Sequence, residues 1–177
     1  MRPVAILLIA GVLIATSALA EDQIISIPGE DWKIRFDAPH LTPDKGVPAS
    51  AFYGRADRLQ ISVFVEPPKC PGGDSDENVY ECFAAVLKRD PIADWDTERA
   101  NTRPNGGVTV MYMTHVETGG AKGSAFNINL LLVYKGKWVD MHTSIASPTQ
   151  GDVKALFAIV NSAEIVPASP NDRSPTP

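Results

Sequence analysis

The chain has 177 residues, with 16 Lys or Arg against 21 Asp or Glu, so its formal net charge is −5. This length fits one ordinary domain that buries a core of its own. The acidic balance excludes a nucleic-acid-binding surface, because phosphates require a basic face. It also provides no cluster of basic residues for anionic lipids.

Residues 1–20 predict a secretory signal peptide. Arg2 precedes an apolar run from Val4 to about Ile14, and Ala18-Leu19-Ala20 supplies a small-residue cleavage site. The run is too short to span a bilayer, and no cysteine follows it directly, as a lipid-anchored precursor would require. We therefore expect a soluble protein, exported to the periplasm or the exterior, with no membrane insertion after cleavage.

The chain has two cysteines, Cys70 and Cys82. In an oxidising compartment an even pair indicates a structural disulfide. Closing a loop of roughly a dozen residues contributes about 3 kcal/mol in the chain-entropy model. No second cysteine pair completes a zinc site, and His40 and His115 are isolated in the sequence. We expect no metal and no cofactor.

The first half of the chain predicts two hairpins and a helix. Runs 23–27 and 32–37 form the first hairpin, and a proline-rich loop follows over 38–49. Runs 50–55 and 58–66 form the second, across a turn at Ala56-Asp57, with an alternating pattern that predicts one buried face. The helix begins after Ser75, its N-cap, and ends before Pro91. Its apolar face consists of Val79, Cys82, Phe83, Val86 and Leu87.

The second half predicts more hairpins, a second helix and a tail. Strands near 94–103 and 108–117 are joined at Asn105-Gly106-Gly107, and Gly119-Gly120 turns the chain into strands 124–134 and 137–145. A helix follows, with Ser147 as the cap, Pro148 at the first helical position and Gln150 in a capping box. Its buried residues are predicted to be Val153, Leu156, Phe157 and Val160. Residues 163–166 add a short strand.

These elements predict an α+β fold, an antiparallel β-sheet flanked by two main helices. Residues 21–166 form a single domain, and residues 167–177, rich in Pro and Ser, form a disordered tail.

The hairpin at Lys135-Gly136 carries the candidate site. A two-residue turn there sets the pairing of the two strands. On one face it pairs Leu132 with Val139, Leu130 with Met141, Ile128 with Thr143, and Phe126 with Ile145. On the other face it pairs Val133 with Trp138, Leu131 with Asp140, Asn129 with His142, and Asn127 with Ser144. A slip of one residue would mix asparagines into the apolar face, so this register is favoured.

The register gathers a polar cluster on one face of the sheet, beside Leu131. The residues predicted to form a binding surface there are Asn127, Asn129, Trp138, Asp140, His142 and Ser144. Asp, His and Ser together suggest a hydrolase, but residues two apart on a strand lie about 6.5 to 7 Å apart, too far for the contacts of a triad. No nucleophile elbow is present. The alternative is an ordinary solvated sheet face.

The chain resembles PsbP-like domains. The residues that carry this resemblance are Ile25-Ser26-Ile27-Pro28 with residues 32–39, and the closing hairpin 127–145 with the helix 148–162 and Ala163-Glu164-Ile165-Val166. That family includes extrinsic photosystem II subunits, a Ran-binding nuclear import factor and small bacterial exported proteins. The resemblance covers most of residues 23–166 and implies a sheet flanked by helices in an accessory or partner-binding role. The cysteine pair does not map onto the family pattern, and no functional residue carries over.

The leading hypothesis is an exported, non-enzymatic accessory module that binds another protein through the face around Asn129, Trp138, Asp140 and His142. A small-ligand-binding protein with a pocket between sheet and helix is one alternative. An inhibitor or immunity-type protein that neutralises an exported enzyme is another. A hydrolase using Ser144 and His142 is the least favoured. The sequence leaves open the partner and the oligomeric state.

Overall fold

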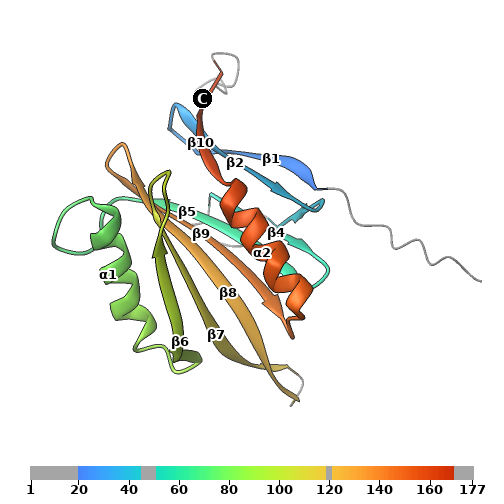
Figure 1. Ribbon diagram of the computed structural model, residues 1–177. Helices are drawn as coiled ribbons and strands as arrows, with labels where there is room; N and C mark the ends of the chain where they lie inside the picture. The colour runs from blue at the N-terminus through green and yellow to red at the C-terminus, as the bar shows by residue number, and fades with distance from the viewer. Residues whose placement is uncertain (1–19, 45–50, 119–120, 170–177) are drawn as a thin grey trace, which may run out of the picture.

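The computed structural model describes residues 20–44, 51–118 and 121–169. The predicted signal peptide up to residue 19, the turn at Gly119-Gly120 and the tail from residue 170 lie outside the described residues. The elements in chain order (Figure 1) are β1 (Glu21–Ser26), β2 (Trp32–Ala38), β3 (Thr42–Pro43), β4 (Phe52–Ala56), β5 (Leu59–Glu66), α1 (Asp76–Leu87), β6 (Ala93–Thr102), β7 (Val108–Thr118), β8 (Ala121–Tyr134), β9 (Lys137–Ala146), α2 (Gln150–Ser162) and β10 (Glu164–Pro167).

The strands form two antiparallel sheets. The large sheet has the order β3-β4-β5-β9-β8-β7-β6, and the small sheet has the order β1-β2-β10. The α+β fold class with two helices is confirmed, while the sequence had predicted a single sheet. The first hairpin, β1 and β2, is not part of the large sheet. Its third strand is β10, in which Ile165 pairs with Ile34 of β2.

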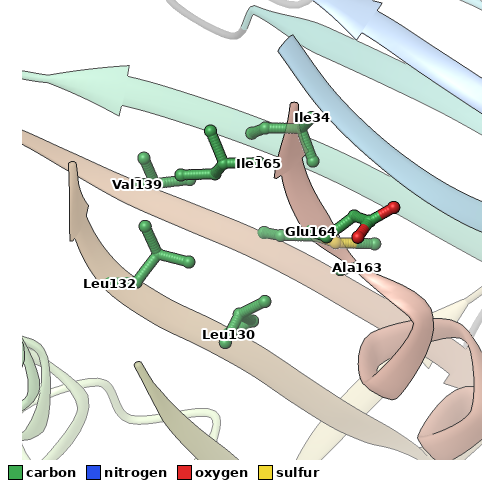
Figure 2. Close-up of a pocket in the computed structure, with 8 residues that line it drawn as sticks. Ile34, Leu130, Leu132, Val139, Ala163, Glu164 and Ile165 are labelled. Atoms are coloured by element: carbon green, nitrogen blue, oxygen red, sulfur yellow. The ribbon is translucent and has the colours of Figure 1, made fainter. Parts of the chain in front are cut away.

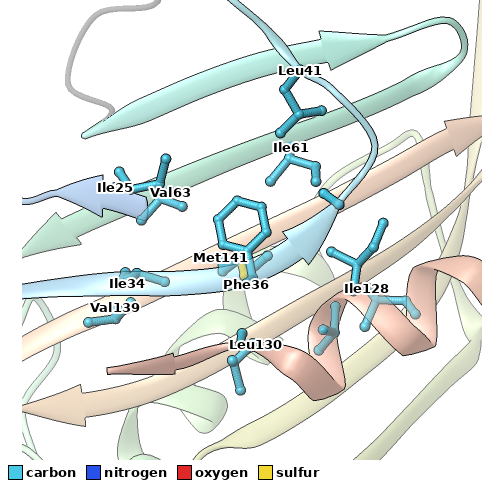
Figure 3. Close-up of a cluster of buried hydrophobic side chains, with 14 of the residues drawn as sticks. Ile25, Ile34, Phe36, Leu41, Ile61, Val63, Ile128, Leu130, Val139 and Met141 are labelled. Carbon is cyan, nitrogen blue, oxygen red and sulfur yellow. The ribbon is translucent and has the colours of Figure 1, made fainter. Parts of the chain in front are cut away.

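The main core lies between the large sheet and a layer made of the small sheet and α2. Figure 3 shows Ile34 and Phe36 of β2 directed toward the same layer as Ile61 of β5 and Met141 of β9. α2 packs on β2, β8 and β9, and its buried residues are Leu156, Ile159 and Val160. Each large apolar side chain fully buried here contributes about 1.5 to 3 kcal/mol.

A second core lies on the opposite face of the large sheet, under α1, which packs on β7 and β8. Its buried members are Val79 and Leu87 of α1 with Val108, Val110, Tyr112, Leu131 and Trp138 of the sheet. Asp76, the first residue of α1, connects the helix to this face of the sheet by hydrogen bonds. Its carboxylate accepts hydrogen bonds from the Gly107 and Val133 backbone N–H groups, both at 2.7 Å. Both faces of the large sheet are therefore covered.

Three local predictions need correction. The β4–β5 turn consists of Asp57 and Arg58, one residue later than predicted, because Ala56 pairs with Leu59 and Asp57 takes a φ of 50°. Val86 is 66% exposed, because the buried line of α1 runs through Val79 and Leu87 instead. The predicted Ser75 N-cap of α1 is confirmed.

The third correction concerns the start of α2. Its N-cap is Thr149 rather than Ser147, and its capping-box partner is Asp152 rather than Gln150. Asp152 is favoured because its carboxylate accepts hydrogen bonds from the Thr149 backbone N–H and from Arg58, each within 2.9 Å. These contacts lower the pKa of Asp152, the Thr149 backbone N–H having the largest effect.

Strand β10 runs to Pro167, one residue past the predicted domain end at residue 166. Pro167 pairs with Trp32 in the small sheet, and the Ala168 N–H donates to the Asp31 carbonyl at 2.9 Å.

Candidate functional site

The β8–β9 hairpin has the predicted register throughout, from Tyr134 opposite Lys137 to Ala125 opposite Ala146. Lys135 and Gly136 form the two-residue turn with φ values of 49° and 72°. Positive φ at both positions is the geometry of a type I′ turn, whose twist matches that of the strands. The six residues predicted to form a binding surface therefore lie on one face, which is the face that α1 covers.

Burial divides the six residues into two groups. Asn127, Asn129 and Trp138 are buried, with exposed fractions of 3%, 2% and 6%. Asp140, His142 and Ser144 are half-buried. A partner can therefore reach only the second group directly, and the role of this face in binding stays a prediction. The sequence did not predict that α1 covers this face, because the contacts between α1 and the sheet join segments far apart in the sequence.

Asn127 organises one end of the network. Its amide nitrogen donates to the Thr114 hydroxyl at 3.1 Å and to the Ala125 carbonyl at 3.2 Å. Its amide oxygen lies 3.1 Å from Nε2 of His142. Since that oxygen can only accept, Nε2 of the neutral imidazole carries the proton. Burial lowers the pKa of His142 to about 4, so the ring is neutral near pH 7.

Asn129 and Asp140 form the other end. The Asn129 amide nitrogen donates to Oδ1 of Asp140 at 2.6 Å. Burial raises the pKa of Asp140 to about 6, the Asn129 hydrogen bond opposes this shift, and the charge of Glu66 adds to it. Burial, followed by the charge of Asp140, also raises the pKa of Tyr112, which lies on β7.

Two buried polar atoms of this network have no hydrogen-bonding partner among the described protein groups, Oδ1 of Asn129 and Nε1 of Trp138. A buried donor or acceptor without a partner costs about 1 to 3 kcal/mol. The cluster therefore combines buried polar groups with the half-buried Asp140, His142 and Ser144.

The arrangement does not assemble a catalytic triad. His142 binds Asn127, and Asp140 binds Asn129. No hydrogen bond joins Ser144 to His142 in the part of the chain that the structure describes. Neither a nucleophile–base pair nor a base–carboxylate pair is therefore formed by these three residues.

The described residues contain no group of three or more His, Cys, Asp or Glu side chains placed to hold a metal ion. Likewise, no helix in the described ranges is long and apolar enough to cross a membrane.

A small cavity lies between the two sheets, away from the polar face. Figure 2 shows Ile34 and Ile165 of the small sheet opposite Leu130, Leu132 and Val139 of the large sheet. Its volume is about 10 Å³, whereas small-molecule sites have roughly 300 to 1,000 Å³. This gap between sheet layers therefore gives no support to the small-ligand hypothesis.

The predicted disulfide is present. Cys70, in the loop after β5, is bonded to Cys82 in the middle of α1, with their Cα atoms 6.0 Å apart. The bond ties the loop before α1 to the helix that covers the polar face.

These features define an antiparallel α+β protein of the Mog1/PsbP-like fold class. The structure is similar to that of Mog1p, a Ran-binding protein of Saccharomyces cerevisiae, with a TM-score of 0.52 and 11% identity over 82% of this chain and 95% of that chain. The resemblance to PsbP-like domains is thus supported at the level of the fold.

Two further structures are more distant. A protein of Bacteroides thetaiotaomicron gives a TM-score of 0.46 with 7% identity, over 80% of this chain and 47% of that one. LpqN of Mycobacterium tuberculosis, involved in cell envelope biogenesis, gives a TM-score of 0.45 with 13% identity over 84% of this chain and 86% of that one. No protein-family model matches the sequence, and no curated protein matches it.

Proposed function

We propose that this chain is an exported, non-enzymatic module that binds another protein. The observation that carries the proposal is the fold, which extends over nearly the whole of Mog1p, a protein described as Ran-binding. The large sheet ends in the edge strands β3 and β6 among the described strands, and an exposed sheet edge can pair with a partner. The Cys70–Cys82 bond supports export, because disulfides persist in oxidising compartments.

The hydrogen bonds of the polar cluster support a non-enzymatic role. A general base must reach its nucleophile within about 2.6 to 3.2 Å, but Nε2 of His142 is occupied by Asn127. Among the described residues no hydrogen bond joins Ser144 to His142, so His142 is not positioned to activate the Ser144 hydroxyl. Labelling of Ser144 by a fluorophosphonate probe would contradict this part of the proposal and revive the hydrolase alternative.

The test is a cross-linked pull-down from the native exported fraction, read by mass spectrometry. The bait is the oxidised chain without residues 1–20, and the control bait is the same protein reduced, alkylated and unfolded. We expect one protein to be enriched by the folded bait alone. Equal recovery by both baits, or no enriched protein, contradicts the proposed function. If the enriched protein is an enzyme whose activity falls on binding, the inhibitor subtype is supported.

A further inference from the structure

The negative charge of the chain is concentrated in one segment. Residues 74–99 contain eight acidic and three basic residues, and the rest of the chain contains thirteen of each. The segment therefore carries the whole formal net charge of −5. It comprises α1, the turn after it and most of β6.

This segment forms one end of the molecule. β6 is the edge strand of the large sheet, so one side of it has no partner among the described strands. α1 lies beside it in Figure 1. Tyr80 of α1 joins the two elements by donating to Glu98 of β6 at 3.2 Å. We call this region the α1–β6 surface and define it by Val86, Asp90, Ile92, Asp94, Asp96 and Glu98.

Exposed apolar side chains lie within the same region. Three large hydrophobic residues of the described chain are exposed, and two of them are on the α1–β6 surface, Val86 at 66% and Ile92 at 49%. Apolar side chains among charged ones are the composition of a protein-binding surface, where a few buried contacts supply most of the affinity. A surface kept acidic for solubility alone does not require them.

The surface already holds two cationic side chains of its own chain. The Lys88 ammonium lies 4.5 Å from the centre of the Trp95 ring, a cation–π contact. The Arg99 guanidinium donates to the Asp96 carbonyl at 3.1 Å and to the Glu98 carbonyl at 2.5 Å. The Trp95 ring and these two backbone carbonyls therefore contact cationic side chains of the chain itself.

We propose that the α1–β6 surface is the docking site for a basic, extended segment of the protein partner. In such a segment Lys or Arg side chains lie against the carboxylates along β6, and the alternate apolar side chains cover Val86 and Ile92. A nucleic acid, or the same surface of a second copy of this chain, is disfavoured, because each would bring negative charge to the α1–β6 surface. The inference rests on the proposed function, since it names the surface and the class of partner.

The probe for the test is a fluorescein-labelled peptide of alternating Lys and Val, and the readout is fluorescence anisotropy with the full mature protein. The test variant is Asp94→Lys with Asp96→Lys. The control variant is Asp22→Lys with Asp57→Lys, two exposed carboxylates on β1 and in the β4–β5 turn. Both variants raise the net charge by the same amount, so they separate local contact from the field of the whole protein.

We expect the test variant to bind the peptide at least 10-fold more weakly than wild type and the control variant to stay within 2-fold. Ile92→Ser should weaken binding about 3-fold or more, because it removes the apolar contact and leaves the charge. No binding by wild type, or an equal loss in both charge variants, overturns the docking site. Circular dichroism and melting curves show whether each variant is folded.

The same variants used as baits in the pull-down separate the two proposals. A partner that is captured by wild type and by the control variant, but lost with the test variant, supports the docking site. A partner that all three baits capture overturns the docking site and leaves the proposed function standing. A pull-down in which no bait enriches a protein overturns the proposed function, whatever the peptide shows.

Discussion

Asp140 and His142 lie two residues apart on β9 and titrate in opposite senses on folding. Asp140 has a pKa raised from 3.8 to about 6, chiefly by burial, so the folded state takes up a proton between these values. His142 has a pKa lowered from 6.5 to about 4 by burial, so the folded state releases a proton over nearly the same range. Glu66 on β5 and Tyr112 on β7 are the other titratable groups coupled to Asp140.

The signs of the two effects on stability follow from proton linkage. The contribution of Asp140 is fully present below pH 3.8 and is lost as the pH rises through about 6. The contribution of His142 is present above pH 6.5 and is lost as the pH falls toward about 4. Between about pH 6.5 and about pH 4.5, linkage gives each group an effect of about 2 kcal/mol on the free energy of unfolding, with opposite sign. In the wild type the two effects nearly cancel.

Replacing either residue leaves the effect of the other on the pH dependence of stability uncompensated. Asp140→Asn should lose about 2 kcal/mol more than wild type when the pH is lowered over this range, because only the His142 effect remains. His142→Gln, which keeps an N–H donor for Asn127, should lose about 2 kcal/mol less than wild type. Urea unfolding at about pH 6.5, 5.5 and 4.5 measures each difference, and the other carboxyl groups cancel in the comparison with wild type.

Two results would refute this reasoning. If both variants keep the pH dependence of wild type, the two side chains are hydrated and their pKa values lie near the ordinary ones. If both variants change in the same direction, the network rearranges as a unit and the two groups do not act separately. The double variant should return to a pH dependence close to that of wild type.

Three further predictions concern α1 and its surroundings. Asp76→Asn should cost about 1 to 3 kcal/mol in urea unfolding, because it weakens two half-buried hydrogen bonds to a charged carboxylate. Glu77→Gln, which removes the same charge from the first helical turn, should cost under about 0.5 kcal/mol. Gly107→Ala should destabilise more than Gly29→Ala, by about 1 kcal/mol or more. Both glycines have φ near 80°, but only at Gly107 would a Cβ lie 2.9 Å from the Leu131 carbonyl oxygen. Reducing the disulfide should lower the free energy of unfolding by about 3 kcal/mol, and intact-mass measurement after alkylation should find no free thiol before reduction.

The register of the β8–β9 hairpin was accessible to sequence reasoning because only one pairing keeps both asparagines out of the apolar face. The same argument placed Asp140, His142 and Ser144 beside them. The register argument did not predict which of these side chains are hydrogen-bonded to each other. Directly opposite pairs would be Asn129 with His142 and Asn127 with Ser144, but the bonds join diagonal neighbours, Asn127 with His142 and Asn129 with Asp140. Side chains of this length reach diagonal positions in a sheet.

Other features depend on contacts between distant segments. The alternation of Trp32, Ile34 and Phe36 shows that β2 has one apolar face. That face would be buried equally well if β2 joined the large sheet or if it belonged to a second sheet stacked on it. The start of α2 was ambiguous for a similar reason, since Ser147 and Thr149 both fit a cap. The choice is made by Asp152, whose carboxylate accepts from the Thr149 backbone N–H and from Arg58 in the distant β4–β5 turn.

The small sheet has a consequence for how the chain reaches its final structure. Its third strand, β10, is only four residues long and pairs with β2, and an ion pair joins Arg35 to Glu164 across 129 positions of the sequence. Contacts between such distant positions form slowly, because a long loop must close first. A chain still being synthesised lacks this strand until the residues after α2 emerge, and a chain cut after α2 leaves the β10-facing edge of β2 open. Without β10, Ile34 loses its strand partner Ile165.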